Sequence, residues 1–405
     1  MSTERRASTT RVVSVAAATQ GVAMLPMFLT GALAVQMSAE LGFGLSALGL
    51  ATGGFILARA IASVPAGFLV DRLGSIRSMR LSAIGSGLAS LSVALLVSDW
   101  WILATILFLA GLVQAMSQPA ANRFVLRSAD PDRLGIAFGL KQSGPPAAIM
   151  LAGITVPVIA LTLGWRWAFV LAATLSLITL LAVPARPVTS SVAAAAPETR
   201  PDAARDTAGI GDLAHVRGRG SQELMPIMLG MAFTLAAVNS TQTFIVGAAV
   251  DSGISPGVAG SLLAVGGVLA IVSRIISGLH VDRKQGGYLT YVARILAAGS
   301  VGYLLLAVGR PSAYLLGTVL AYAATWGVNG VLFMAIVRYR PDRPAAISGQ
   351  VIAVGSIGGF VGPPLYGLVA ENLGYTPAWL MAMVWVALAA LLIGASPLAR
   401  AEQRG

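Results

Sequence analysis

Twelve long apolar runs, separated by short polar breaks, dominate the sequence. A helix needs about 20 mostly apolar residues to cross the hydrocarbon of a bilayer, and each run is close to that length. The runs are continuously apolar rather than alternating, which favours helices over the strands of a membrane barrel. The sequence therefore predicts an all-α membrane protein with twelve transmembrane helices. The expected spans are 12–37, 46–70, 81–97, 100–122, 135–162, 165–184, 223–250, 256–281, 288–308, 312–337, 345–370 and 377–396.

An internal repeat divides these runs into two sets of six. Residues of the break after helix 2 recur after helix 8 with a shift of 211 positions, so that Gly67, Asp71 and Arg72 correspond to Gly278, Asp282 and Arg283. We expect two pseudo-symmetric six-helix bundles, 1–184 and 223–405, joined by a cytoplasmic central loop, 185–222. The loop is rich in Ala, Pro, Thr and mixed charges, which is typical of a flexible tether.

The charges are sparse and unevenly distributed. Only 11% of the residues are charged and 56% are hydrophobic, whereas a soluble domain carries roughly a quarter charged residues. Of the 27 lysines and arginines, all but four lie at or near helix ends on one side. By the positive-inside rule that side is cytoplasmic, so we expect a plasma (inner) membrane protein with both termini inside. The net charge of +11 is then a topology signal that suits the lipid bilayer, and no nucleic-acid partner is expected.

Several classes of function lack the residues they require. The chain has no cysteine and only two histidines, His215 and His280, which are far apart, so no metal site is expected. An intramembrane enzyme needs a nucleophile, a metal or an acid–base pair at depth, and no such set is present. No phosphate-binding loop for ATP occurs, and no cofactor is expected. A membrane sensor on a carrier scaffold is a remote alternative, because such proteins usually append a signalling domain.

The break after helix 2 carries a specific motif. Its pattern, Gly-x-x-x-Asp-Arg-x-Gly-x-x-Arg, consists of Gly67, Asp71, Arg72, Gly74 and Arg77. It resembles the signature of the loop between helices 2 and 3 in transporters of the major facilitator superfamily. The second copy after helix 8 keeps Gly278, Asp282 and Arg283, but it lacks a counterpart of the last basic residue, Arg77. The resemblance implies a secondary carrier whose halves rock about a site at mid-depth, which gives alternating access.

The same resemblance implies a conformational latch. Asp71 would meet the amino end of helix 11, near residues 345–348, where the helix dipole and free N–H groups stabilise a carboxylate. Asp282, beside Arg283, would do likewise at the start of helix 5, near Gly135. The alternative is that both acids only neutralise neighbouring arginines.

Arg59 and Arg274 fall inside predicted spans. A cation in lipid is costly and usually faces a cavity or a counter-charge, yet no Asp or Glu lies near the centre of any span. An anionic substrate would supply the missing charge. Arg274, four residues before Gly278, is similar to the helix-8 pattern of nitrate, oxalate and monocarboxylate carriers in that superfamily, whereas Arg59 departs from their spacing. Alternatively, Arg274 snorkels to the inner surface and Arg59 binds backbone carbonyls or water.

Uncharged polar residues lie on the helices that line the cavity in this family, namely 1, 4, 7 and 10. Amides and aromatics of this kind bind substrates, but they also join membrane helices to one another. In helix 4, Gln114, Gln118 and Asn122 have the spacing of one helix face. The candidate contacts are Gln20, Gln114, Gln118, Asn239, Gln242, Trp326 and Asn329, with Tyr322 on the face of the last two.

We therefore predict a carrier of a small organic or inorganic anion. The alternative is efflux of hydrophobic compounds, because Gly144-Pro145-Pro146 resembles the Gly-Pro motif of drug–proton antiporters. Ala147 and Ala148 occupy the positions where that motif has glycines, and this difference argues against efflux. Protons are a candidate coupling ion, although the usual carboxylate relay is missing, and a monomer is expected.

Overall fold

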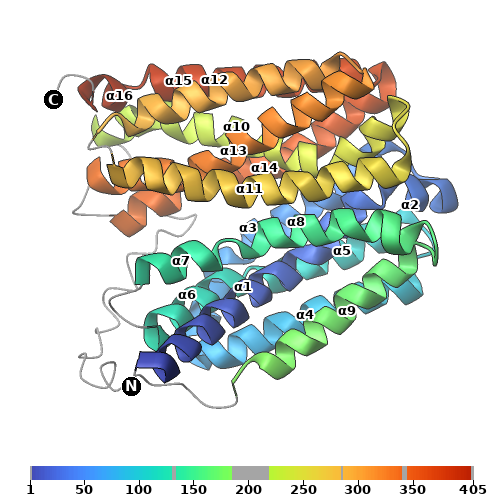
Figure 1. The fold of residues 1–405 in the computed structure, drawn as a ribbon, viewed down its shortest axis with the longest axis horizontal. Helices are drawn as coiled ribbons and strands as arrows, with labels where there is room; N and C mark the ends of the chain where they lie inside the picture. The colour runs from blue at the N-terminus through green and yellow to red at the C-terminus, as the bar shows by residue number, and fades with distance from the viewer. Residues whose placement is uncertain (1, 130–133, 185–218, 284–285, 340–343, 403–405) are drawn as a thin grey trace.

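The computed structural model describes residues 2–129, 134–184, 219–283, 286–339 and 344–402. Over these ranges the chain forms helices joined by short turns (Figure 1). The first group of helices comprises α1 (Ser2–Ala32), α2 (Ala34–Leu41), α3 (Leu45–Leu73), α4 (Ser75–Leu96), α5 (Trp100–Gln114), α6 (Ser117–Ser128), α7 (Leu134–Lys141), α8 (Gly144–Thr155), the π-helix η2 (Val156–Ala160) and α9 (Trp165–Ala182). The second group comprises α10 (Arg219–Asp251), α11 (Pro256–Arg283), α12 (Tyr288–Ala307), α13 (Pro311–Tyr339), α14 (Pro344–Leu373), α15 (Tyr375–Gly394) and α16 (Pro397–Glu402).

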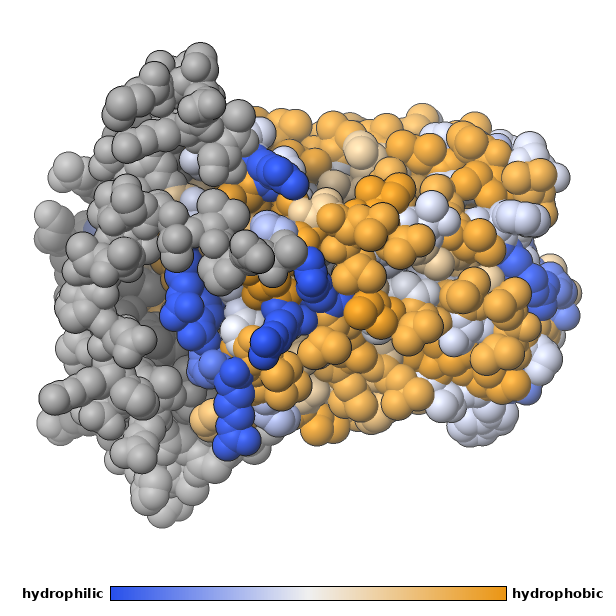
Figure 2. All heavy atoms as spheres, turned by 90° about the horizontal axis from the view of Figure 1, so that it is seen from below, coloured by the Kyte–Doolittle hydropathy of each residue, from blue (hydrophilic) through white to orange (hydrophobic). Residues whose placement is uncertain are grey.

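Twelve stretches of the described helices are long and apolar enough to cross a membrane, which confirms the predicted number. Their outer surface has the matching polarity. Figure 2 shows a broad belt of apolar side chains, with hydrophilic side chains gathered toward the two ends of the molecule. Lipid is therefore the solvent that fits this surface.

The first span is shorter than predicted. The expected run 12–37 is divided, because α1 ends at Ala32 and α2 follows as a separate helix after Leu33. Gly42 then adopts a left-handed conformation, with φ of 68°, which ends α2. An apolar run cannot reveal such a break, because the residues on both sides of it are apolar.

The fourth and fifth spans are interrupted helices. The fourth consists of α5 and α6, separated by Ala115 and Met116, and the fifth consists of α7, α8 and η2. Pro145 and Pro146 follow Gly144 in the first turn of α8. In a continuous helix their positions would donate N–H groups to the carbonyls of Lys141 and Gln142, but proline has no N–H. These two carbonyls therefore lack their helical donors.

The two groups of helices lie against each other, and both chain termini lie at the same end (Figure 1). We call this the terminal end, and we call the other, which carries α2, the opposite end. The groups meet through α3 with α14, α8 with α11, and α1 with α10. The division of the chain at 184 and 223 stays a prediction, and most of the central loop lies outside the described residues.

The groups approach most closely toward the opposite end. A Cβ built on Gly31 would lie 2.7 Å from the carbonyl oxygen of Gln242, and one built on Gly267 would lie 2.6 Å from the backbone nitrogen of Met150. Toward the terminal end, a Cβ on Gly67 or Gly278 would have no described atom within 4 Å. The structure is therefore one that is closed at the opposite end.

Candidate substrate site

Arg59 lies on the face of α3 that turns toward the second group. Thr52, seven residues earlier, has its hydroxyl 3.4 Å from that of Thr243 on α10. Ile56 and Asn239 approach the same point, because a Cβ on Gly359 would lie 3.4 Å from the Ile56 side chain and 3.0 Å from the Asn239 amide nitrogen. Residues spaced by three, four and seven share a helix face, so Arg59 follows Ile56 by one turn on this face. Within the described residues, no hydrogen bond or ion pair occupies its guanidinium.

Arg274 connects the two groups. Its guanidinium donates to the carbonyl oxygen of Gln142, the acceptor that Pro146 deprives of a helical donor. Its Nε lies 3.4 Å from the carbonyl oxygen of Trp326, and its guanidinium carbon lies 4.9 Å from the centre of that indole ring. This cation is therefore held by neutral groups, two carbonyl dipoles and an aromatic face.

Lys141 is a third basic residue inside the membrane-spanning region. It ends α7, within the span Ile136–Ala160, and only 1% of its surface is exposed. Its ammonium group donates to Oδ1 of Asn122 on α6 and lies 5.4 Å from the centre of the Phe138 ring. The count of basic residues at or near the ends of the spans included Lys141, whereas the structure buries it within a span. The lysine is buried because α7 continues to it and Asn122 supplies an acceptor at that depth.

The predicted amides occupy different environments. Gln20, Gln114 and Gln242 are buried, and no described group donates to the side-chain oxygen of any of them. An unpaired buried polar atom costs about 1–3 kcal/mol, so these oxygens are suited to a water molecule or a substrate donor. Gln118 is exposed, so it does not share the environment of Gln114 as its spacing predicted. The side chain of Asn329 lies outside the described residues.

The helix 2–3 motif lies at the terminal end. Asp71 pairs with Arg123 of its own group at 2.7 Å, and 59% of the Asp71 side chain is exposed. Gly74 has φ of 81°, a conformation that favours glycine, and it ends α3. The other motif residues, Arg72 and Arg77, are exposed. The side chains of Asp282 and Arg283 lie outside the described residues, and the latch stays a prediction.

The sequence comparison decides the family. The sequence model of the Major Facilitator Superfamily matches residues 16–363, most of the chain. The chain belongs to the major facilitator superfamily. Two uncharacterized MFS-type transporters of Mycobacterium tuberculosis, one from strain CDC 1551 / Oshkosh and one from strain ATCC 25618 / H37Rv, are similar to it. Each is 25% identical over 336 residues, which cover 81% of this chain and 72% of the relative.

Solved structures of this superfamily have the same fold. The nucleoside transporter NupG is 14% identical with a TM-score of 0.76, covering 96% of this chain and 99% of its own. A D-xylose-proton symporter is 13% identical with a TM-score of 0.74, covering 96% and 97%. A bacterial homolog of the human lysosomal transporter Spinster, in an inward-facing and unoccupied conformation, is 14% identical with a TM-score of 0.74, covering 100% and 98%. At these identities the likeness shows the fold alone, and it confirms the twelve-helix MFS architecture.

As a superfamily member, the chain is a multi-pass membrane transporter and a secondary carrier. The structure brings Arg274 and Trp326 together, and it places Asn239 close to Ile56, which precedes Arg59 by one turn of α3. It shows no direct contact between Arg59 and Arg274. Sequence reasoning did not select Lys141. The available signal was its position, four residues before the first proline of a predicted span, which places it within the helix rather than in a loop.

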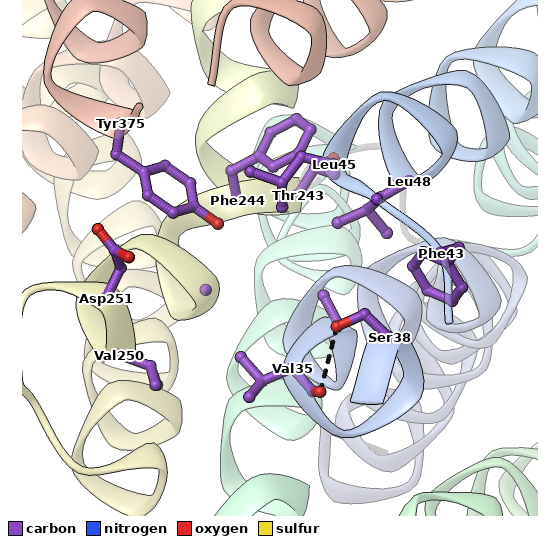
Figure 3. A pocket seen from close by; sticks show the side chains of 13 residues that line it. Val35, Ser38, Phe43, Leu45, Leu48, Thr243, Phe244, Val250, Asp251 and Tyr375 are labelled. Atoms are coloured by element: carbon purple, nitrogen blue, oxygen red, sulfur yellow. Dashed lines mark hydrogen bonds between the residues drawn. The ribbon is translucent and has the colours of Figure 1, made fainter. Parts of the chain in front are cut away.

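A separate pocket lies between the groups at the opposite end (Figure 3). Its volume is about 340 Å³. Val35, Ser38 and Phe43 line one side, and Asp251 and Tyr375 lie across from them (Figure 3). None of the predicted substrate contacts lines this pocket, so it is distinct from the candidate site around Arg59.

Proposed function

We propose that this carrier moves a small anion by alternating access, with Arg59 as the charge that meets the substrate. One observation carries the proposal. In the described spans, three basic side chains at depth, Arg59, Lys141 and Arg274, have no carboxylate partner. The two ion pairs among the described residues, Asp71 with Arg123 and Glu40 with Arg166, lie near the ends of the molecule.

The energetics favour an anion over a cation. A charge held at depth without an opposite charge costs several kcal/mol, and an entering anion recovers part of that cost. Arg59 is the best placed, because it lies on the face between the groups and its guanidinium has no described partner. The unpaired oxygens of Gln20, Gln114 and Gln242 accept hydrogen bonds, which favours an organic anion that carries a donor, such as a hydroxyl, over a bare inorganic ion.

Sidedness belongs to the same proposal. The terminal end carries the basic residues that the positive-inside rule places in the cytoplasm. The structure, closed at the opposite end, then corresponds to an inward-facing carrier. Coupling to protons stays a prediction.

The test is a thermal-shift screen of the purified protein with organic anions, inorganic anions and lipophilic cations. We expect organic anions to stabilise the wild type. We expect R59Q to weaken their apparent affinity by at least tenfold, and R59K to retain part of it. R310Q is the matched control, because it removes the same charge from an exposed loop.

Two results would overturn the proposal. Stabilisation by lipophilic cations alone would favour the alternative, efflux of hydrophobic compounds. Wild-type anion affinity in R59Q would remove Arg59 from the substrate site.

A further inference from the structure

Helices α3 and α14 run antiparallel along the boundary between the two groups. Gly367 lies beside Leu45, Gly49 beside Pro363 and Gly53 beside Phe360, so the numbering rises on one helix as it falls on the other. The amino end of α3 therefore meets the carboxyl end of α14 at the opposite end of the molecule.

At that meeting point, a residue of α14 caps α3. Glu371, in the last turn of α14, accepts a hydrogen bond from the backbone N–H of Ser46 at 2.6 Å. The residue in the N-cap position of α3 is Gly44, which offers no side chain for this purpose. A Cβ on Gly44 would collide with the Glu371 carboxylate, so a larger residue there would displace this flexible side chain from its present position. The first turn of α3 is thus capped by a carboxylate from the other group.

The same register leads to Asp71 at the terminal end. Asp71 lies in the last turn of α3, at the end of the molecule where α14 begins with Pro344. Each helix therefore carries a carboxylate in its last turn, at the end of the molecule where the other helix begins. In this structure the Glu371 cap is formed, whereas Asp71 is bonded to Arg123 of its own group.

We propose that Glu371 is the gating residue of the opposite end, and that its cap on α3 alternates with the Asp71 contact on α14 that the family motif implies. When the groups rock about their middle, one end closes as the other opens, so the two caps cannot form together. Each cap stabilises the conformation in which it is made. Loss of the Glu371 cap therefore shifts the population toward the conformation open at the opposite end.

The absence of native cysteines provides a direct readout. Thr243 is 3% exposed, lines the pocket at the opposite end and contacts Thr52 across the boundary, so T243C should react slowly with a hydrophilic thiol reagent in this conformation and faster when the opposite end opens. In this background we expect E371Q to raise the labelling rate roughly five- to tenfold, the size of a lost helix cap. We expect D71N to lower the rate, because the cap that it removes from the competing conformation outweighs the half-exposed ion pair with Arg123 that it removes from this one.

The matched control is E40Q, which also removes a carboxylate at the opposite end, but one whose partners belong to its own group. We expect E40Q to leave the labelling rate unchanged. A wild-type rate in E371Q, or an equal rise in E40Q, would overturn the proposal. The opposite sign of D71N separates gating from general loosening of the fold. The readout needs no substrate, so it is independent of whether the cargo is an anion.

Discussion

Gly53 and Gly54 are neighbours on α3 and offer a matched pair of perturbations. A Cβ on Gly53 would lie 2.7 Å from the carbonyl oxygen of Phe360 and 2.8 Å from the ring of Pro364, both on α14. A Cβ on Gly54 would have no described atom within 4 Å. We expect G53A to destabilise the conformation closed at the opposite end, and G54A to leave it unchanged.

The magnitude follows from the contact. An ordinary van der Waals contact begins at 3.4 Å, so a methyl group at Gly53 must push the helices apart by roughly 0.7 Å. The obstructing atoms belong to a backbone carbonyl and a proline ring, which cannot rotate away. Overpacking of this kind costs about 1–3 kcal/mol, equivalent to about a 5- to 150-fold shift in population. The gain of up to about 1 kcal/mol from replacing glycine by alanine in a helix applies to both conformations and cancels.

The assay is thiol labelling of T243C, a position that is buried across the same boundary. We expect the labelling rate to rise by at least fivefold in G53A and to remain at the reference value in G54A. Equal rates in the two variants would refute the claim that contact between α3 and α14 closes this end. An equal rise in both would indicate a general effect on the helix instead.

Three other substitutions test the described contacts. P146A restores an N–H donor to the carbonyl that Arg274 contacts, so we expect a rise in anion affinity of about tenfold, measured by thermal shift, with no rise in P145A. K141M removes a buried ammonium that only a neutral group, Asn122, accepts from, so we expect transport by proteoliposomes to fall while the protein remains folded; full transport would make the lysine dispensable. Hydrogen bonds from Arg166 and Trp165 lower the pKa of Glu40, so its contribution to stability is present at neutral pH and lost on acidification. We expect E40Q to lower Tm slightly at pH 7 and the difference to shrink steadily as the pH falls below the ordinary Glu pKa of about 4.3.

The sequence alone predicts the twelve spans because lipid imposes a simple rule. A spanning helix must satisfy its own backbone and present about 20 apolar residues, and both requirements can be read along the chain. The breaks cannot be read in the same way. Leu33 interrupts helices within apolar sequence, where nothing in the polarity pattern marks the change.

The candidate site could be predicted only in part. The sequence indicates that Arg274 is buried and that Pro146 leaves a carbonyl free, but not that the two meet. Their contact joins residues 132 positions apart in different helix groups. The contact depends on the relative register of α8 and α11. The periodicity of a single helix does not reveal how that helix is placed along another. Glu371 presents the same difficulty, because as a sequence feature it is only an acidic residue near a helix end.

If Glu371 gates and the basic residues at depth bind an anion, as proposed, the two roles differ in how charge is distributed. Among the described residues, the carboxylates at helix ends have partners of two kinds. Glu371 at the opposite end bonds to the other group of helices, whereas Asp71 at the terminal end bonds to its own group. The basic residues at depth have neutral partners or none. A full ion pair at depth would satisfy a buried arginine permanently, and an anionic substrate would then have to compete with a fixed carboxylate. A carbonyl dipole interacts more weakly than a charge, so an entering anion can displace it and gain the difference. Arg274 on the Gln142 carbonyl therefore has the arrangement expected of a cation that is held in place until a substrate arrives.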